Sequence, residues 1–297
     1  MITMKALTRK LVKQGNGGLT VCLPKEWISS QFLKAGDEIR FYRQEQSLLI
    51  LNPNNKKKRI LKVSFSNIDE SLIRSELTNA YRNGYDVIEC TVNPVAFDTI
   101  KSICSDYLLG FEVFEKDEKT ILLESMFLSE FQNFDHIISK FFITGELIFN
   151  KFLKEDITRY VKDFEKYSNY FKRMIILGSF SMEKNYFFWT FISDLSHVFR
   201  MCKYIQVEND LSKYKGNSSL EKLTSSLNNM YSILKYTYLK KNNSRLDELY
   251  TFQKNLVFTL PEQFYKDISP QLVSQLIVIG RLLYLATSPL RGVLQGN

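Results

Sequence analysis

The chain has few of the residues from which most catalytic and metal sites are built. Among its 297 residues there are two histidines and four cysteines, and no two cysteines have the C-x-x-C spacing of zinc and redox sites. The sequence also lacks a P-loop, a G-x-G-x-x-G segment and an H-E-x-x-H motif. An enzyme is therefore not expected. The scattered cysteines fit a reducing, intracellular compartment and predict no disulfide framework: Cys22, Cys90, Cys104 and Cys202.

Long hydrophobic runs are missing as well. The most apolar late segment, LIVIGRLLYLA at 276–286, is shorter than the roughly 20 residues that a membrane span needs, and it carries Arg281 in its middle. The opening segment MITMKALTRK has no apolar stretch behind its charges, so no secretory signal is predicted. These features predict a cytoplasmic protein without membrane insertion.

Positive charge is abundant, but only at one end of the chain. The net charge is +8, whereas residues 1–62 hold thirteen basic and four acidic residues, a net charge of +9. The remaining residues therefore sum to −1. This segregation predicts that any contact with a polyanion is made by the N-terminal segment. The alternative is that these charges only keep the surface soluble.

Residues 1–52 have the pattern of short strands and tight turns. In GNGGLTVCLPKEW (15–27), three glycines supply turn geometry before a short apolar strand. Pro24 ends that strand and suits the start of a short helix. A Lys-Ala-Gly-Asp turn (34–37) and two strands joined by a polar hairpin, EIRFY and SLLIL, are expected to follow.

Residues 53–126 predict a small α/β domain behind the polar linker PNNKKK (53–58). The apolar spacing changes between period two and helical spacing along this stretch. The expected elements are a strand (RILKVSF), a helix (69–84), a strand (YDVIECTV), a helix opened by Asn93-Pro94 and closed by Gly110, and two strands (FEVFE and TILLE).

Residues 127–297 are predicted to be helical. In 220–238 the apolar residues recur every three and four positions, which is typical of an amphipathic helix. The expected helices are 128–153, 156–177, 182–207, 217–240, 244–258 and 264–290. Two sets of three helices suggest a duplicated three-helix bundle.

The segment RKLVKQGNGGLTVCLPKEWISSQFLKAGDEIRFY resembles the AbrB/MazE/SpoVT family of swapped-hairpin DNA-binding domains. The shared features are Arg9-Lys10, the glycine turn, the apolar strand that ends in Leu-Pro-Lys-Glu-Trp, and Lys-Ala-Gly-Asp-Glu. The resemblance implies that two chains each supply half of a barrel, and that the protein is a homodimer through its N-terminal domain.

The resemblance also implies which residues contact DNA. Family members place the residues near the first strand and the glycine turn at the DNA face, which nominates Arg9, Lys10, Lys13 and Lys25 in this chain. An arginine that family members often carry after the turn is replaced by Gly18 and Leu19. These basic residues are therefore expected to contact phosphates rather than to read bases.

The order of parts in the whole chain is similar to that of archaeal phosphate-uptake regulators, in which an AbrB-like domain precedes a helical domain of the PhoU type. The middle segments LIRSELTNAYRNGYDVIEC and LLGFEVFEKDEKTILLESM carry this likeness. The expected fold is multidomain α+β, with a swapped-hairpin barrel (1–52), a small α/β connecting domain (53–126) and a PhoU-like pair of three-helix bundles (127–297).

Helices of the PhoU type carry Glu-x-x-x-Asp motifs that hold metal clusters, and this chain has lost most of those carboxylates. The equivalent positions hold Ile192, Ser196, Ile277 and Arg281. We therefore expect no metal cluster and no cofactor, although three carboxylates remain for a single weak site: Asp163, Glu165 and Asp194. The two histidines, His136 and His197, are expected to be hydrogen-bonded helix residues rather than ligands.

Two functions are consistent with these features. In the first, the protein is a DNA-binding transcriptional regulator of the phosphate-uptake type, whose helical domain senses a signal or contacts a partner. In the second, DNA binding has been lost, and the protein regulates a phosphate transporter or its sensor by protein contact alone. The concentration of basic charge in residues 1–62 favours the first.

Overall fold

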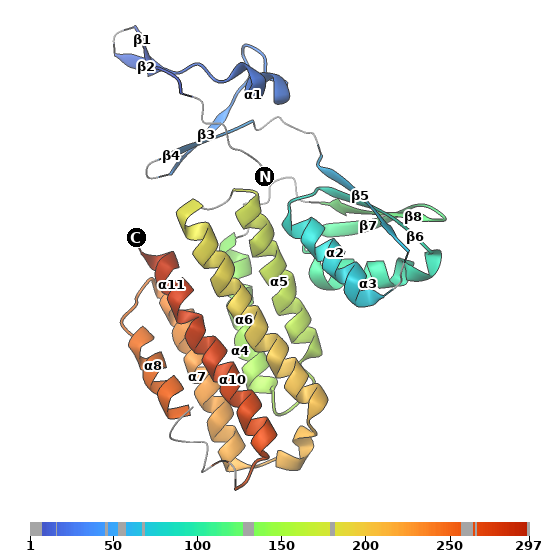
Figure 1. Cartoon of the computed structure of the whole chain (residues 1–297), viewed down its shortest axis with the longest axis vertical. Coiled ribbons are helices and arrows are strands. Elements are labelled where there is room, and N and C mark those ends of the chain that lie inside the picture. Colours follow the sequence, from blue (N-terminus) through green and yellow to red (C-terminus); the bar gives the residue numbers. More distant parts are fainter. Residues whose placement is uncertain are drawn as a thin grey trace. The chain divides into compact units, whose positions relative to one another are not determined.

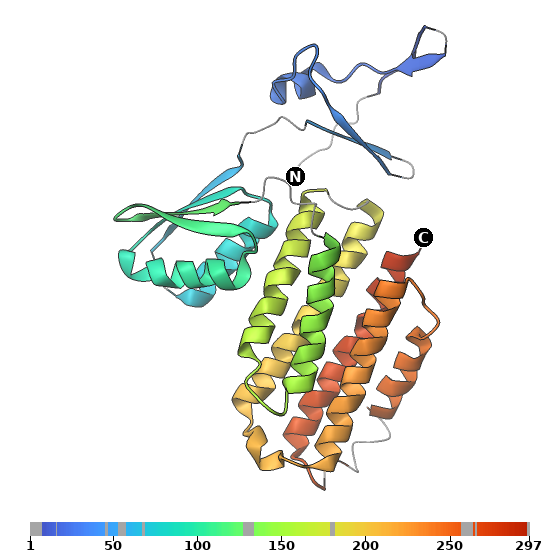
Figure 2. The same cartoon turned by 180° about the vertical axis from the view of Figure 1, so that it is seen from behind.

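The computed structural model of the chain describes residues 8–15, 17–44, 47–52, 58–66, 69–126, 134–178, 182–256, 264 and 266–295. The chain divides into two compact units, residues 1–58 and residues 59–297. The fold is mixed α and β, with small sheets and a helical C-terminal region (Figures 1 and 2).

The first unit consists of two antiparallel strand pairs and a short helix. Its elements are β1 (Val12–Gln14), β2 (Gly18–Thr20), α1 (Lys25–Ser30), β3 (Arg40–Gln44) and β4 (Ser47–Leu51). The glycine turn joins β1 to β2 as predicted, because Gly15 and Gly17 have φ angles of +60° and +126° that other residues rarely adopt. The Lys-Ala-Gly-Asp turn is also present, and the Lys34 amide donates to Asp37 Oδ2 at 2.6 Å.

This unit has no hydrophobic core of its own among the residues that the structure describes. None of its described side chains is buried, and neither of the two hydrophobic clusters of the protein includes one of its residues. Apolar side chains of the first hairpin are more than half exposed: Leu11, Val12 and Leu19. The first unit thus leaves much apolar surface exposed among its described residues.

The second unit begins with a four-stranded sheet and two helices, in the order that the sequence predicts. Its elements are β5 (Ile60–Phe65), α2 (Glu70–Arg82), β6 (Val87–Val92), η1 (Pro94–Ala96), α3 (Phe97–Tyr107), β7 (Phe111–Asp117) and β8 (Thr120–Ser125). The strand order is β5-β6-β8-β7, with β5 parallel to β6 and the other pairs antiparallel. Asp69 and Asn93 cap α2 and η1 with their side chains.

The two faces of this sheet differ in polarity. Alternate residues of β6, such as Ile88 and Cys90, are fully buried in the cluster that α2 and α3 complete on one face (Figure 2). The other face carries Glu89, which pairs with Lys62 at 3.3 Å and with Lys116 at 3.0 Å. The period-two pattern of the strands therefore separates a packed face from a solvated one.

The rest of the unit is helical: α4 (Phe134–Lys151), α5 (Thr158–Ile176), α6 (Met182–Glu208), η2 (Leu211–Tyr214), α7 (Ser218–Lys240), α8 (Leu246–Lys254), α10 (Pro270–Leu285) and α11 (Thr287–Leu294). The predicted helix 264–290 is corrected in two ways. It begins at Pro270, because Ser269 caps the Leu272 amide, and it is divided at Ala286. The predicted residues 128–133 lie outside the described residues.

The helices share one continuous core, whereas two separate three-helix sets were expected. Helix α6 packs against α5 and also against α10 and α11, and α4 packs against α7. The core is rich in aromatic rings, and the rings of Phe141 and Phe164 stack with centroids 4.0 Å apart. Close approach requires glycine at Gly145, where an added Cβ would lie 2.1 Å from the hydroxyl oxygen of Tyr231.

Polar contacts join the α/β part to the helices within this unit. The buried side chain of Arg173 on α5 donates to the carbonyl oxygens of Tyr81 (2.9 Å) and Tyr85 (2.8 Å) and pairs with Asp86 at 3.3 Å. Helices α2 and α3 both pack against α5. The junction is therefore specified by directional bonds as well as by apolar packing.

One helical stretch, Pro270–Leu294, is long and apolar enough to cross a membrane by length and composition. A core helix of a soluble protein passes the same test. Here Leu272, Leu276 and Ile279 are fully buried among the other helices of the bundle. The core accounts for these buried residues, whereas Val278 and Leu285 of the same stretch are exposed.

Candidate functional site

The four basic residues proposed for DNA contact are all exposed. Arg9 and Lys10 precede β1, Lys13 lies within it, and Lys25 is the first residue of α1. None of the four has an ion-pair partner among the residues that the structure describes. Their charges are therefore not neutralised within the described chain and are accessible to an external anion.

The first hairpin places basic and apolar side chains on the same face. Lys13 lies directly opposite Leu19 in the antiparallel β1–β2 pair, so their side chains point to the same side. Leu19 is 64% exposed. This face of the hairpin therefore combines a cation with an exposed leucine.

The remaining carboxylates of the helices do not converge on a metal site. Glu165 Oε1 lies 2.5 Å from Arg200 Nε, so an arginine takes the place that a cation would need. Burial raises the pKa of the Asp194 carboxyl. No group of three or more histidine, cysteine, aspartate or glutamate side chains suited to a metal ion is found in the described part of the chain.

The histidines differ from the expectation that they would be hydrogen-bonded. His136 on α4 and His197 on α6 are exposed, and neither makes a hydrogen bond to a described residue. The pKa of His197 is lowered by partial burial and by the nearby charges of Arg200 and Lys172. Both side chains lie on exposed faces of their helices, where water can bond to the rings. Helical spacing in the sequence does not show which way a side chain points, so this difference was not predictable.

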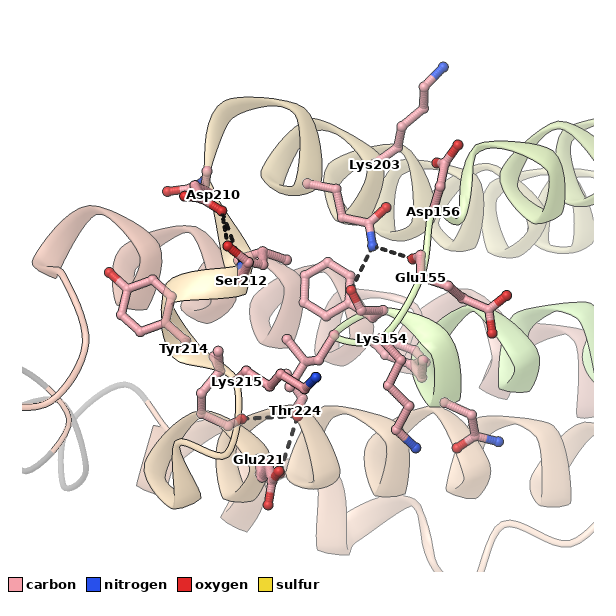
Figure 3. A pocket seen from close by; sticks show the side chains of 18 of the residues that line it. Lys154, Glu155, Asp156, Lys203, Asp210, Ser212, Tyr214, Lys215, Glu221 and Thr224 are labelled. Atoms are coloured by element: carbon pink, nitrogen blue, oxygen red, sulfur yellow. Dashed lines mark hydrogen bonds between the residues drawn. The ribbon is translucent and has the colours of Figure 1, made fainter.

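A large hollow of the second unit lies at one end of the helical bundle (Figure 3). It has a volume of about 1380 Å³ and is lined by the turn after α4, the end of α6, η2 and the start of α7. Its wall carries both signs of charge, as the labelled Lys154, Glu155, Asp156 and Lys215 show.

Most polar groups of this hollow are already used by local turns. Gln206 donates to the carbonyl oxygens of Phe152 (2.6 Å) and Glu155 (2.9 Å), and Asp210 accepts from Ser212, toward which it points in Figure 3. The hydroxyl of Thr224 donates to backbone oxygens of its own helix. The wall therefore presents neither an excess of one charge nor an unused buried donor, and its polar groups serve to close the turns.

We compared the chain with protein-family models, with curated proteins and with solved structures. None of them matches it. The argument for function therefore rests on the chain's own residues.

A second, smaller polar cavity lies between α2, α5 and α6, and sequence reasoning missed its residues. The lining includes Arg82 and Arg200, which are 118 positions apart in the sequence, and Lys172 lies beside them. Each lies on a helix whose spacing was predicted correctly. Only the packing of α5 against α2 and α6 brings these cations together. One feature of the sequence could have indicated a buried cation: Lys172 stands in the aromatic stretch NYFKRM.

Proposed function

We propose that the protein is a DNA-binding transcriptional regulator that acts as a homodimer. In this proposal the first unit completes a swapped-hairpin barrel of the AbrB type with a second chain, and Arg9, Lys10, Lys13 and Lys25 contact the phosphates of a duplex. The helical part, of the PhoU type, transmits a signal or contacts a partner such as a phosphate transporter or sensor. The protein is cytoplasmic, does not insert into a membrane and catalyses no reaction.

One observation carries this proposal. The first unit has unpaired, exposed basic residues and no buried side chain among the residues described, although its strands and turns are formed. A chain segment of this size needs a core or a partner to be stable, because backbone ordering costs about 1–2 kcal/mol per residue. A two-fold dimer supplies the partner and presents each basic residue twice on one assembly.

DNA binding is tested by gel shift and fluorescence anisotropy on duplex DNA at several salt concentrations. The variant that carries Arg9→Ala, Lys10→Ala and Lys13→Ala removes six cations per dimer. The slope of log affinity against log salt should fall by about five, at roughly 0.9 per phosphate contact. The control carries Lys215→Ala, Lys240→Ala and Lys254→Ala, which remove as many charges from the second unit.

The control should bind DNA as the wild type does. If the wild type does not bind any duplex at low salt, DNA binding is refuted, and regulation by protein contact alone takes its place. If both triple variants lose affinity equally, the effect is one of net charge and the proposed interface is wrong.

Dimerisation is tested separately with Leu19→Asp in the full chain. Replacing an exposed leucine by aspartate is nearly neutral in a monomer, but it places a charge in the core of a swapped barrel. The variant should sediment as a monomer and lose DNA binding. Val95→Asp, an equally exposed site in the second unit, serves as the control. A wild-type monomer, or an unchanged mass for Leu19→Asp, would contradict the swapped barrel.

A further inference from the structure

A polar cavity of about 290 Å³ lies where the α/β part meets the helical bundle. Three helices that are distant in sequence form its walls: α2, α5 and α6. Hydroxyl, amide and charged groups dominate the lining. Its charged lining residues are Arg74, Arg82, Lys162, Glu165, Arg200 and Lys203, and Ser168, Asn169 and Ser196 add polar groups.

Part of the positive charge around this cavity is balanced by carboxylates. Three cations have an acidic partner: Arg74 pairs with Glu70, Lys162 with Asp106, and Arg200 with Glu165. These pairs explain the presence of three cations without a ligand. They also engage Glu165, the acidic residue in the lining.

Three further cations form no ion pair with a described residue: Arg82 and Lys203 of the lining, and Lys172 beside it. Arg82 donates through Nε (2.9 Å) and Nη2 (2.7 Å) to the amide oxygen of Asn169 and through Nη1 to Asn79. Lys172 is 5% exposed and makes no hydrogen bond to a described residue; its ammonium lies 5.4 Å from the ring centre of Trp189. None of the three positive charges is paired with a carboxylate of the described residues.

Lys172 belongs to the same charge cluster as the cavity lining. It lies three and four positions after Asn169 and Ser168 on α5, and therefore on the same helical face. Burial and the charges of Arg82 and Arg200 lower the pKa of its ammonium to about 7. Burial, followed by the charge of Arg200, also lowers the pKa of Arg82. Keeping these like charges close together and partly buried lowers the stability of the folded protein, and a bound anion would offset this loss.

Two hydroxyls of the cavity lining satisfy each other. Ser168 is 2% exposed, and its Oγ lies 2.8 Å from Oγ of Ser196, which is also 2.9 Å from the carbonyl oxygen of Ile192. The single proton of Ser196 can be donated to only one of these two oxygens. When it is donated to Ile192, the Ser168 hydroxyl donates to Ser196, and both protons are used.

We propose that this cavity binds a small oxyanion of charge −2, either free phosphate or sulfate or the phosphate group of a small metabolite. Arg82, Lys172 and Lys203 are positive charges without a carboxylate partner among the described residues, and the guanidinium of Arg82 supplies directional donors. The same excess of positive charge excludes a metal ion. Since α2 belongs to the α/β part and α5 to the bundle, the bound anion would join the two. This inference does not depend on DNA binding.

The test uses the full chain in calorimetric titrations and thermal melts at pH 7 and constant ionic strength. Phosphate, sulfate and glycerol 3-phosphate are the ligands, and chloride is the reference. The wild type should show a saturable rise in melting temperature with at least one of the dianions. Equal binding of phosphate and sulfate identifies a free oxyanion, whereas tighter binding of glycerol 3-phosphate identifies a phosphorylated metabolite.

Lys172→Met keeps the volume and removes one of the three positive charges that have no carboxylate partner. It should weaken binding roughly tenfold or more, the loss of about one charge-assisted hydrogen bond. Lys240→Met, an exposed residue of α7, is the matched control and should bind as the wild type does. No saturable response to any dianion, or an equal response in wild type and Lys172→Met, would overturn the proposal.

Discussion

Replacing the buried Lys172 by methionine should stabilise the protein in a pH-dependent way. Burial lowers the pKa of this ammonium from 10.5 to about 7, with smaller contributions from Arg82 and Arg200 that Glu165 partly opposes; His197 also faces it. Because of this difference in pKa, Lys172 lowers the free energy of unfolding by about 4 kcal/mol at pH 7.

Part of that gain is lost with the contact to Trp189. A desolvated cation–π contact is worth about 1–2 kcal/mol, so the net stabilisation at pH 7 is expected to be about 2–3 kcal/mol. The unfolded chain keeps the proton up to pH 10.5, whereas the folded chain releases it above about pH 7. The destabilisation by Lys172 is therefore complete below pH 7 and decreases between pH 7 and 10.5. The stability difference between Lys172→Met and the wild type should decrease over the same range.

Urea unfolding followed by the far-ultraviolet helix signal measures this difference. Wild type and Lys172→Met are compared at pH 6, 7, 8.5 and 10 in buffers free of phosphate and sulfate, with Lys240→Met as the control. Because each pH is a comparison between two chains, the titration of other groups cancels. A variant that is less stable than the wild type at pH 7, or a difference that does not shrink toward pH 10, would refute the reasoning.

Three further predictions concern the second unit and the cysteines. Gly145→Ala should lower the stability by about 1–3 kcal/mol in urea unfolding, because its methyl group would overlap a buried tyrosine hydroxyl. Arg173→Met should cost about 3 kcal/mol and raise hydrogen exchange in α2 before α6, because it removes the bonds that join the two parts; equal exchange in both helices would contradict this. A thiol reagent should label the exposed Cys22 quickly and react with Cys90 and Cys104 only on unfolding, since burial raises the pKa of both thiols to about 12; rapid labelling of more than one thiol would contradict their burial.

Much of the local structure was predictable, because short-range physics determines it. The turn at Gly15 and Gly17 needs positive φ angles, and Asp69 and Asn93 cap helices with their own side chains. The elements of the α/β part followed from changes in hydrophobic period. The division of the last helix at Ala286 was not predicted, although Thr287, Ser288 and Pro289 follow it and Pro289 has no N–H for the carbonyl oxygen four residues before it.

The sequence by itself determined the order of the elements, the turn chemistry and the confinement of basic charge to one end, because each depends on residues that are close in the chain. Tertiary structure alone decided that the helices share one core, that Arg173 joins the two parts of the second unit, and that Arg82 and Lys172 come close to each other. The physical reason is distance along the chain, because these side chains belong to helices that come together only when the protein packs. Burial changes the free energy of a charged side chain only after that packing has formed.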